Sequence, residues 1–211
     1  MAIVVIGGHS RNIGKTSAVC ALISALPDRH WTAIKITQFG HGICSANGEP
    51  CDCDTGDHTV AISEERDATT GTDSSRYLAA GAARSLWART RVGQLAEAMP
   101  RIRAVIARDE NVVLESNSIL RFLQPDFYAA VLDPGVADFK ASALRYLDRA
   151  DAILLCAPYL RNSGWDGVSL KLIEDTPKFR ITPPSYASAE FAAYVAEKLE
   201  RLERGRSLQP G

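Results

Sequence analysis

Near its start the chain reads Gly8-His9-Ser10-Arg11-Asn12-Ile13-Gly14-Lys15-Thr16-Ser17. The apolar run before this stretch, residues 2–7, predicts a strand, and the pattern over residues 15–26 predicts a helix. A glycine-containing loop between a strand and a helix, ending in Gly-Lys-Thr, is the setting of a Walker A loop. Its backbone N–H groups and the positive end of the helix dipole are suited to holding a triphosphate.

Individual side chains of this loop have distinct expected roles. Lys15 would neutralise the β- and γ-phosphates, and the Thr16 hydroxyl would bind Mg²⁺. Arg11 is either a second cation on the γ-phosphate or a solvated loop residue. The predicted nucleotide-binding set is Ser10, Arg11, Asn12, Ile13, Gly14, Lys15, Thr16 and Ser17.

The rest of the chain alternates between strand-like and helix-like segments, which predicts an α/β three-layer sandwich with a mainly parallel sheet flanked by helices, as in P-loop NTPases. We expect one domain over residues 1–204, a Cys/His-rich loop insertion at about 38–59 and a flexible tail at 205–211. The further predicted helices span 74–83, 93–108, 137–149 and 187–202. Pro100 lies within 93–108 and predicts a kink in that helix or a break into two helical pieces. The further predicted strands span 31–37, 60–63, 85–89, 111–115, 127–132, 152–156 and 179–181.

Composition narrows the class of protein. The 211 residues include 24 basic and 25 acidic side chains, so the near-neutral charge argues against nucleic acid as a partner. No apolar run approaches the roughly 20 residues that span a bilayer, so no membrane partner is expected. The first residues predict a strand instead of a signal peptide, and the cysteines form no even disulfide framework, which together favour the cytoplasm.

Three more charged residues follow predicted strands or open a predicted helix. Lys35 belongs to Ile34-Lys35-Ile36-Thr37, which ends the second strand, and its ammonium would point into the ligand crevice or lie on the surface. Glu115 follows the apolar run 112–114 in the manner of a Walker B acid, and would help to hold Mg²⁺ or cap the next turn. Asp73 stands at a helix start, as a cap or a ligand of Mg²⁺ or water. Lys15, Lys35, Asp73 and Glu115 are the predicted catalytic residues, and Thr16 and Glu115 are the predicted Mg²⁺ ligands.

Two stretches resemble known families. Five residues separate Gly8 from Gly14, as in the phosphate loop of dethiobiotin synthetase, and that resemblance implies that Lys35 contacts substrate and phosphate. The stretch Gly71-Thr72-Asp73-Ser74, followed after five residues by Ala80-Gly81-Ala82, resembles the molybdopterin-guanine dinucleotide biosynthesis protein B family. This resemblance covers about residues 1–120 and implies a homodimer with a preference for GTP. In that family a glycine follows the glutamate, where this chain has Ser116-Asn117.

A cysteine- and histidine-rich stretch follows the second strand. Soft sulfur ligands close together in a cytoplasmic protein favour Zn²⁺ or an iron–sulfur cluster. The alternatives are unpaired cysteines, a disulfide or redox-sensing thiols. The candidate ligands are His41, Cys44, Cys51 and Cys53.

Two functions fit these patterns. The first is Mg²⁺-dependent binding of ATP or GTP with hydrolysis, or with phosphoryl transfer to a small-molecule acceptor, in a cofactor-biosynthesis pathway. The second is a nucleotide-binding adaptor or metallochaperone that delivers a metal or pterin cofactor to a partner enzyme. The guanine-reading motif Asn/Thr-Lys-x-Asp does not occur in the sequence, so the residues themselves leave the base open.

Overall fold

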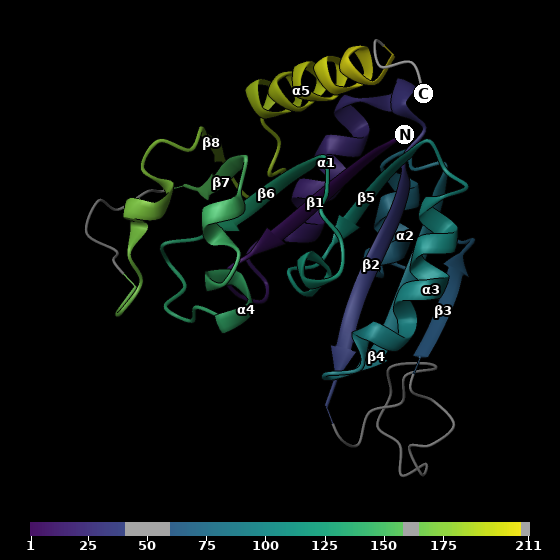
Figure 1. The fold of residues 1–211 in the computed structure, drawn as a ribbon, viewed down its shortest axis with the longest axis horizontal. Helices are drawn as coiled ribbons and strands as arrows, with labels where there is room; N and C mark the ends of the chain where they lie inside the picture. Colours follow the sequence, from purple (N-terminus) through teal and green to yellow (C-terminus); the bar gives the residue numbers. More distant parts are fainter. Residues whose placement is uncertain (41–59, 158–164, 208–211) are drawn as a thin grey trace.

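The computed structural model describes residues 1–40, 60–157 and 165–207. In these residues a single eight-stranded sheet runs in the order β3-β4-β2-β5-β1-β6-β7-β8 (Figure 1). Neighbouring strands are parallel except for β3 and β4, which pair antiparallel at one edge. The strands are β1 (Ala2–Gly8), β2 (Thr32–Phe39), β3 (Val60–Glu65), β4 (Arg84–Arg91), β5 (Asn111–Glu115), β6 (Phe127–Leu132), β7 (Ala152–Cys156) and β8 (Lys178–Ile181).

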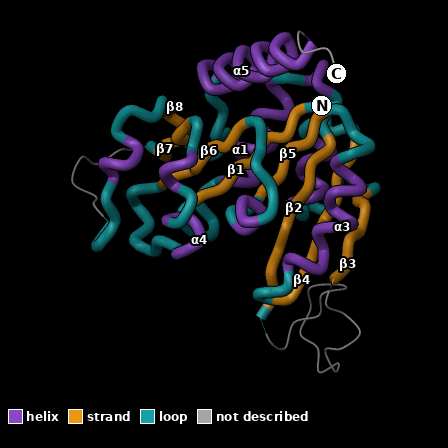
Figure 2. Tube along the Cα trace, viewed as in Figure 1, coloured by secondary structure: helices purple, strands orange, loops and turns teal. Residues whose placement is uncertain are grey.

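Helices cover both faces of the sheet, which confirms the predicted three-layer α/β class (Figure 2). On one face α1, α2 and α5 bury a core with the inward side chains of β1, β6 and β7. On the other face α3 packs over β4 and β3, and short helical turns cover β6 and β7. The α-helices are α1 (Lys15–Ala25), α2 (Asp73–Ala79), α3 (Leu95–Ile106), α4 (Ala141–Leu144) and α5 (Ala189–Ser207).

Strand β1 lies in the middle of the sheet, between β5 and β6. Its apolar side chains are buried on both faces, which explains why residues 2–7 show a continuous apolar run without alternation. The loop after β1 therefore emerges where the parallel strands have their carboxyl ends. Ligands of open α/β sheets bind beside these strand ends.

Several predicted boundaries differ from the structure. The helix expected over 137–149 is wrong: only Ala141–Leu144 is α-helical, followed by a 3₁₀ turn at Leu147–Arg149. Helix α3 is a single element, and Pro100 does not divide it in two. Helix α5 continues to Ser207, so residues 205–207, which were expected in the tail, are helical. Strand β2 extends to Phe39, into the expected loop insertion.

The packing of α1 determines how firmly the loop before it is held. Leu22 of α1 is 1% exposed, whereas Leu202 of α5 is 37% exposed. We expect Leu22→Ala to lower the free energy of unfolding by about 2–5 kcal/mol, because it leaves a cavity in the core. Leu202→Ala, the matched helix substitution, should change it by less than about 0.5 kcal/mol. Urea denaturation of both variants measures the difference, and equal losses would contradict the placement of α1.

Candidate nucleotide site

The loop between β1 and α1 depends on two glycines. Gly14 has a φ of 87°, in the left-handed region, and the Tyr186 ring lies so close that a Cβ would approach it to 2.0 Å. Gly8 lies against the backbone, where a Cβ would approach the Val131 carbonyl oxygen to 2.9 Å. A side chain at either position would displace the loop or its neighbours.

Lys15 opens α1 and folds back over the loop. Its Nζ donates a hydrogen bond to the backbone carbonyl oxygen of Ser10. Burial lowers the pKa of Lys15 to about 8, although the negative charge of Glu115 opposes that shift. A bound anion would favour the charged form of this partly desolvated ammonium. Lys15 therefore has the position and the electrostatics expected of a phosphate-neutralising residue.

Beside Lys15, a cluster of oxygen atoms surrounds the ammonium of Lys35. Lys35 Nζ lies 2.8 Å from Asp73 Oδ2 and 3.3 Å from Thr16 Oγ1, and it forms an ion pair with Glu115 Oε1. The Thr16 hydroxyl donates to Glu115 Oε2 at 2.7 Å. Burial opposes protonation, but the negative charge of Glu115 raises the pKa of Lys35. The structure thus brings together four residues that come from α1, β2, α2 and β5.

Glu115 is the buried centre of this cluster, with an exposed fraction of 3%. The Tyr77 hydroxyl, from α2, donates to the same Oε2 atom that receives the Thr16 hydrogen bond. Burial and the charge of Glu115 raise the pKa of Tyr77 well above its usual value, so the phenol stays a donor. Tyr77 had no expected role because its contact with Glu115 joins residues 38 positions apart.

The donor chemistry of the cluster suits Mg²⁺. Carboxylate and hydroxyl oxygens are the hard ligands that Mg²⁺ prefers, and this group already gathers around a cation, Lys35. Thr16 and Glu115 are the side chains that would hold the ion, with Asp73 beside them. Within the described residues, His, Cys, Asp and Glu side chains form no group of three or more that could hold a metal ion, so this fit depends on the Thr16 hydroxyl as well as on carboxylates.

Asn117 holds Gly8, the first residue of the loop between β1 and α1. Its Oδ1 accepts from the Gly8 N–H at 2.8 Å, and its Nδ2 donates to the Gly8 carbonyl oxygen at 2.7 Å. A Cβ on Gly7 would come within 2.1 Å of the same Oδ1 atom. The side-chain amide of Asn117 therefore bonds to Gly8 as the backbone of a residue in a neighbouring strand would. Sequence reasoning noted Asn117 only as a departure from a family pattern.

The remaining predicted loop residues have different environments. Ser10 is buried, and its hydroxyl donates to Asp138 Oδ2 at 2.6 Å. Ile13 is fully buried, whereas Arg11 and Asn12 are exposed. The Ser17 hydroxyl accepts from Arg76 Nη2 at 2.7 Å, so it faces α2.

The predicted zinc or iron–sulfur ligands lie outside the described residues, and that site stays a prediction: His41, Cys44, Cys51 and Cys53.

The comparisons with known proteins add only a broad likeness. No family model matches the chain, and no curated protein matches it, so the two family resemblances stay predictions. Solved structures that it resembles include HypB from Helicobacter pylori in complex with nickel, at 15% identity and a TM-score of 0.49, covering 94% of this chain and 87% of that one. LpxK from Aquifex aeolicus in complex with ATP has 18% identity and a TM-score of 0.47, and the match covers 85% of this chain and 53% of the LpxK chain. Among the described helices, none has both the length and the apolar character needed to cross a membrane.

The contacts of Asn117 generate a prediction about the stability of the loop. We expect Asn117→Asp to destabilise the protein by about 1–3 kcal/mol, because a carboxylate can accept from the Gly8 N–H but cannot donate to the Gly8 carbonyl oxygen. In Asn117→Ala, which also removes the acceptor, the Gly8 amide should exchange with solvent faster. Urea denaturation and amide hydrogen exchange measure the two effects, and unchanged exchange at Gly8 would contradict the clamp.

Proposed function

We propose that the chain binds a Mg²⁺-nucleoside triphosphate at residues 8–17 and cleaves or transfers its terminal phosphoryl group. The observation that carries this proposal is the contact between Thr16 and Glu115, with the Lys35 ammonium held against both. A hydroxyl on the first helix and an acid on a neighbouring strand are the two protein ligands of Mg²⁺ in P-loop NTPases.

Each residue of the site has a distinct proposed role. The backbone N–H groups at the start of α1 and the Lys15 ammonium would bind the phosphates and offset their negative charge. Lys35 would stabilise negative charge that develops on the transferring group, since it lies beside Thr16 and is held by Glu115. Thr16 and Glu115 would hold Mg²⁺, which would supply further positive charge at the phosphates. Tyr77 keeps the Glu115 carboxylate oriented through its hydrogen bond.

Nucleotide binding is tested by thermal unfolding with ATP and with GTP, each with and without Mg²⁺. A ligand at about 100 times its dissociation constant adds roughly 2.7 kcal/mol of stability. For a chain of this length we therefore expect the midpoint to rise by about 5–10 °C with the preferred nucleotide. Lys15→Ala should abolish the shift, because it removes the ammonium at the phosphates.

Lys198→Ala, which changes a half-buried lysine of α5, is the matched control and should keep the full shift. A wild-type chain that gains no stability from either nucleotide would contradict the proposal. Phosphate release then distinguishes the two functional classes. An enzyme should turn over at about 1 s⁻¹ or faster with its acceptor, whereas an adaptor would show a slow basal rate that responds only to a protein partner.

A further inference from the structure

The segment that follows β6 is tied to the beginning of the phosphate loop by several hydrogen bonds. The Lys140 N–H donates to the His9 carbonyl oxygen at 2.8 Å. The His9 ring bonds to the Asp138 carbonyl oxygen through Nδ1 at 2.7 Å, and its Nε2 accepts from the Asp133 N–H at 3.0 Å. The Ser10 hydroxyl adds its bond to Asp138. Lys140 is therefore held next to the strand-side half of the loop.

The His9 ring makes this attachment rigid. It is fully buried, with ring centroids 5.1 Å from Phe139 and 4.8 Å from Trp165. Burial lowers the pKa of His9, so the ring is neutral at neutral pH. A neutral imidazole can donate through one nitrogen and accept through the other, as both hydrogen bonds require. His9 thus fixes the segment against the loop.

Lys140 brings a further positive charge to a region that already has several. It is half-buried, and burial together with the charges of Arg11 and Lys35 lowers its pKa, while Asp138 opposes the shift. Burial lowers the pKa of Lys15 as well, and the charge of Lys140 adds to that effect. Lys140 is therefore close enough to Arg11, Lys15 and Lys35 for their positive charges to influence one another, and a bound anion would reduce the repulsion among them.

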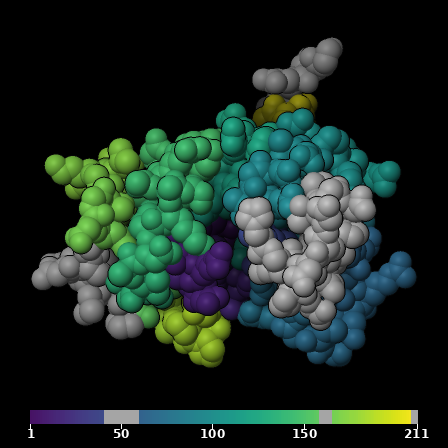
Figure 3. Space-filling model, turned by 90° about the horizontal axis from the view of Figure 1, so that it is seen from below, coloured from purple at the N-terminus to yellow at the C-terminus, as the bar shows by residue number. Residues whose placement is uncertain are grey.

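Seen from the side where the parallel strands end, the purple N-terminal segment lies in a hollow beside the green surface of the chain after β6 (Figure 3). The helix end of a phosphate loop holds the α- and β-phosphates. Lys140 is attached at the opposite end, at His9. A cation attached there would be nearest to the part of a bound phosphate chain that is farthest from α1.

We propose that Lys140 contacts the terminal phosphate of a bound nucleoside triphosphate and makes the site select triphosphates over diphosphates. The assignment rests on the proposed function, since it requires nucleotide in the loop. It differs from the role of Lys15, which would contact the β-phosphate as well and so would bind both tri- and diphosphates. Arg11 is an exposed residue of the same loop, and it provides the competing assignment for the terminal phosphate.

The test compares binding of a non-hydrolysable triphosphate with binding of the diphosphate of the same base, both with Mg²⁺, by calorimetry. We expect Lys140→Ala to weaken triphosphate binding about tenfold or more, because it removes a charged hydrogen bond, and to leave diphosphate binding unchanged. Lys140→Arg should restore most of the preference. Lys15→Ala should weaken both ligands.

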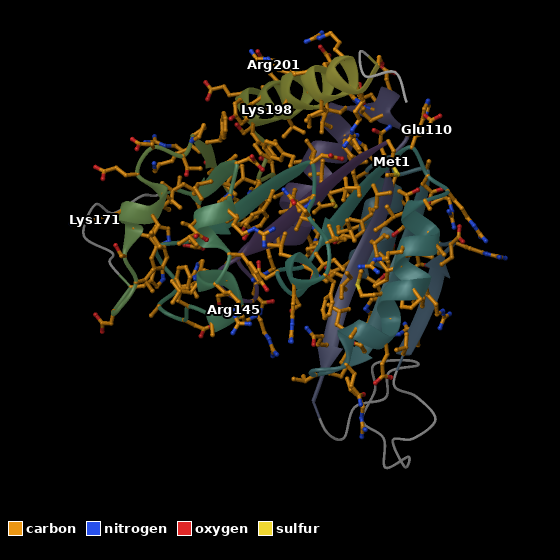
Figure 4. The ribbon with its side chains drawn as sticks, viewed as in Figure 1. Met1, Glu110, Arg145, Lys171, Lys198 and Arg201 are labelled. Carbon is orange, nitrogen blue, oxygen red and sulfur yellow. The ribbon has the colours of Figure 1, made fainter. Side chains whose placement is uncertain are left out.

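Lys198→Ala again serves as control, because Lys198 lies on α5, across the molecule from the strand ends (Figure 4). If Lys140→Ala binds both nucleotides like the wild type, or loses both equally, the assignment is overturned. Loss of triphosphate selectivity in Arg11→Ala with Lys140→Ala unaffected overturns it in favour of Arg11. A wild-type chain that binds neither nucleotide overturns the proposed function itself, which is a separate result.

Discussion

The buried carboxylate of Glu115 organises the part of the sheet where the parallel strands end. A charge with an exposed fraction of 3% is costly unless it is paired and fully hydrogen-bonded. Glu115 meets this requirement with the Thr16 hydroxyl, the Tyr77 hydroxyl and the Lys35 ammonium. These partners come from α1, α2 and β2, so one carboxylate fixes how three elements meet β5 beside the phosphate loop.

The loop itself is held from two other sides. Asn117 binds both backbone groups of Gly8, and the segment after β6 binds His9 and Ser10. These hydrogen bonds hold the first three residues of the loop, 8–10, against the segments that follow β5 and β6. Preorganisation of this kind lowers the cost of ordering the loop around an anion, which is the condition for tight phosphate binding.

Much of this arrangement could be predicted from the sequence, because its signals are local. The buried strands have continuous apolar runs, and Gly14-Lys15-Thr16 opens a helix directly after one of them. Glu115 ends β5, and Lys35 lies within β2 directly opposite Glu115 in the parallel register, so the two side chains reach the same place in the sheet. The helix expected over 137–149 failed, because the backbone of Lys140 bonds to His9 and only a short helical turn follows.

The contributions of Tyr77, Asn117 and Lys140 arise from partners 38, 109 and 131 positions away, and no local pattern reports such contacts.

The central claim is that Thr16 and Glu115 hold a divalent cation next to bound phosphates. Mn²⁺, which replaces Mg²⁺ and has an electron paramagnetic resonance signal, tests it in the presence of a non-hydrolysable triphosphate. The account predicts that Glu115→Gln weakens Mn²⁺ binding about tenfold or more, whereas Glu110→Gln, at an exposed acid on the opposite edge, leaves it unchanged. Equal Mn²⁺ binding by wild type and Glu115→Gln would contradict it.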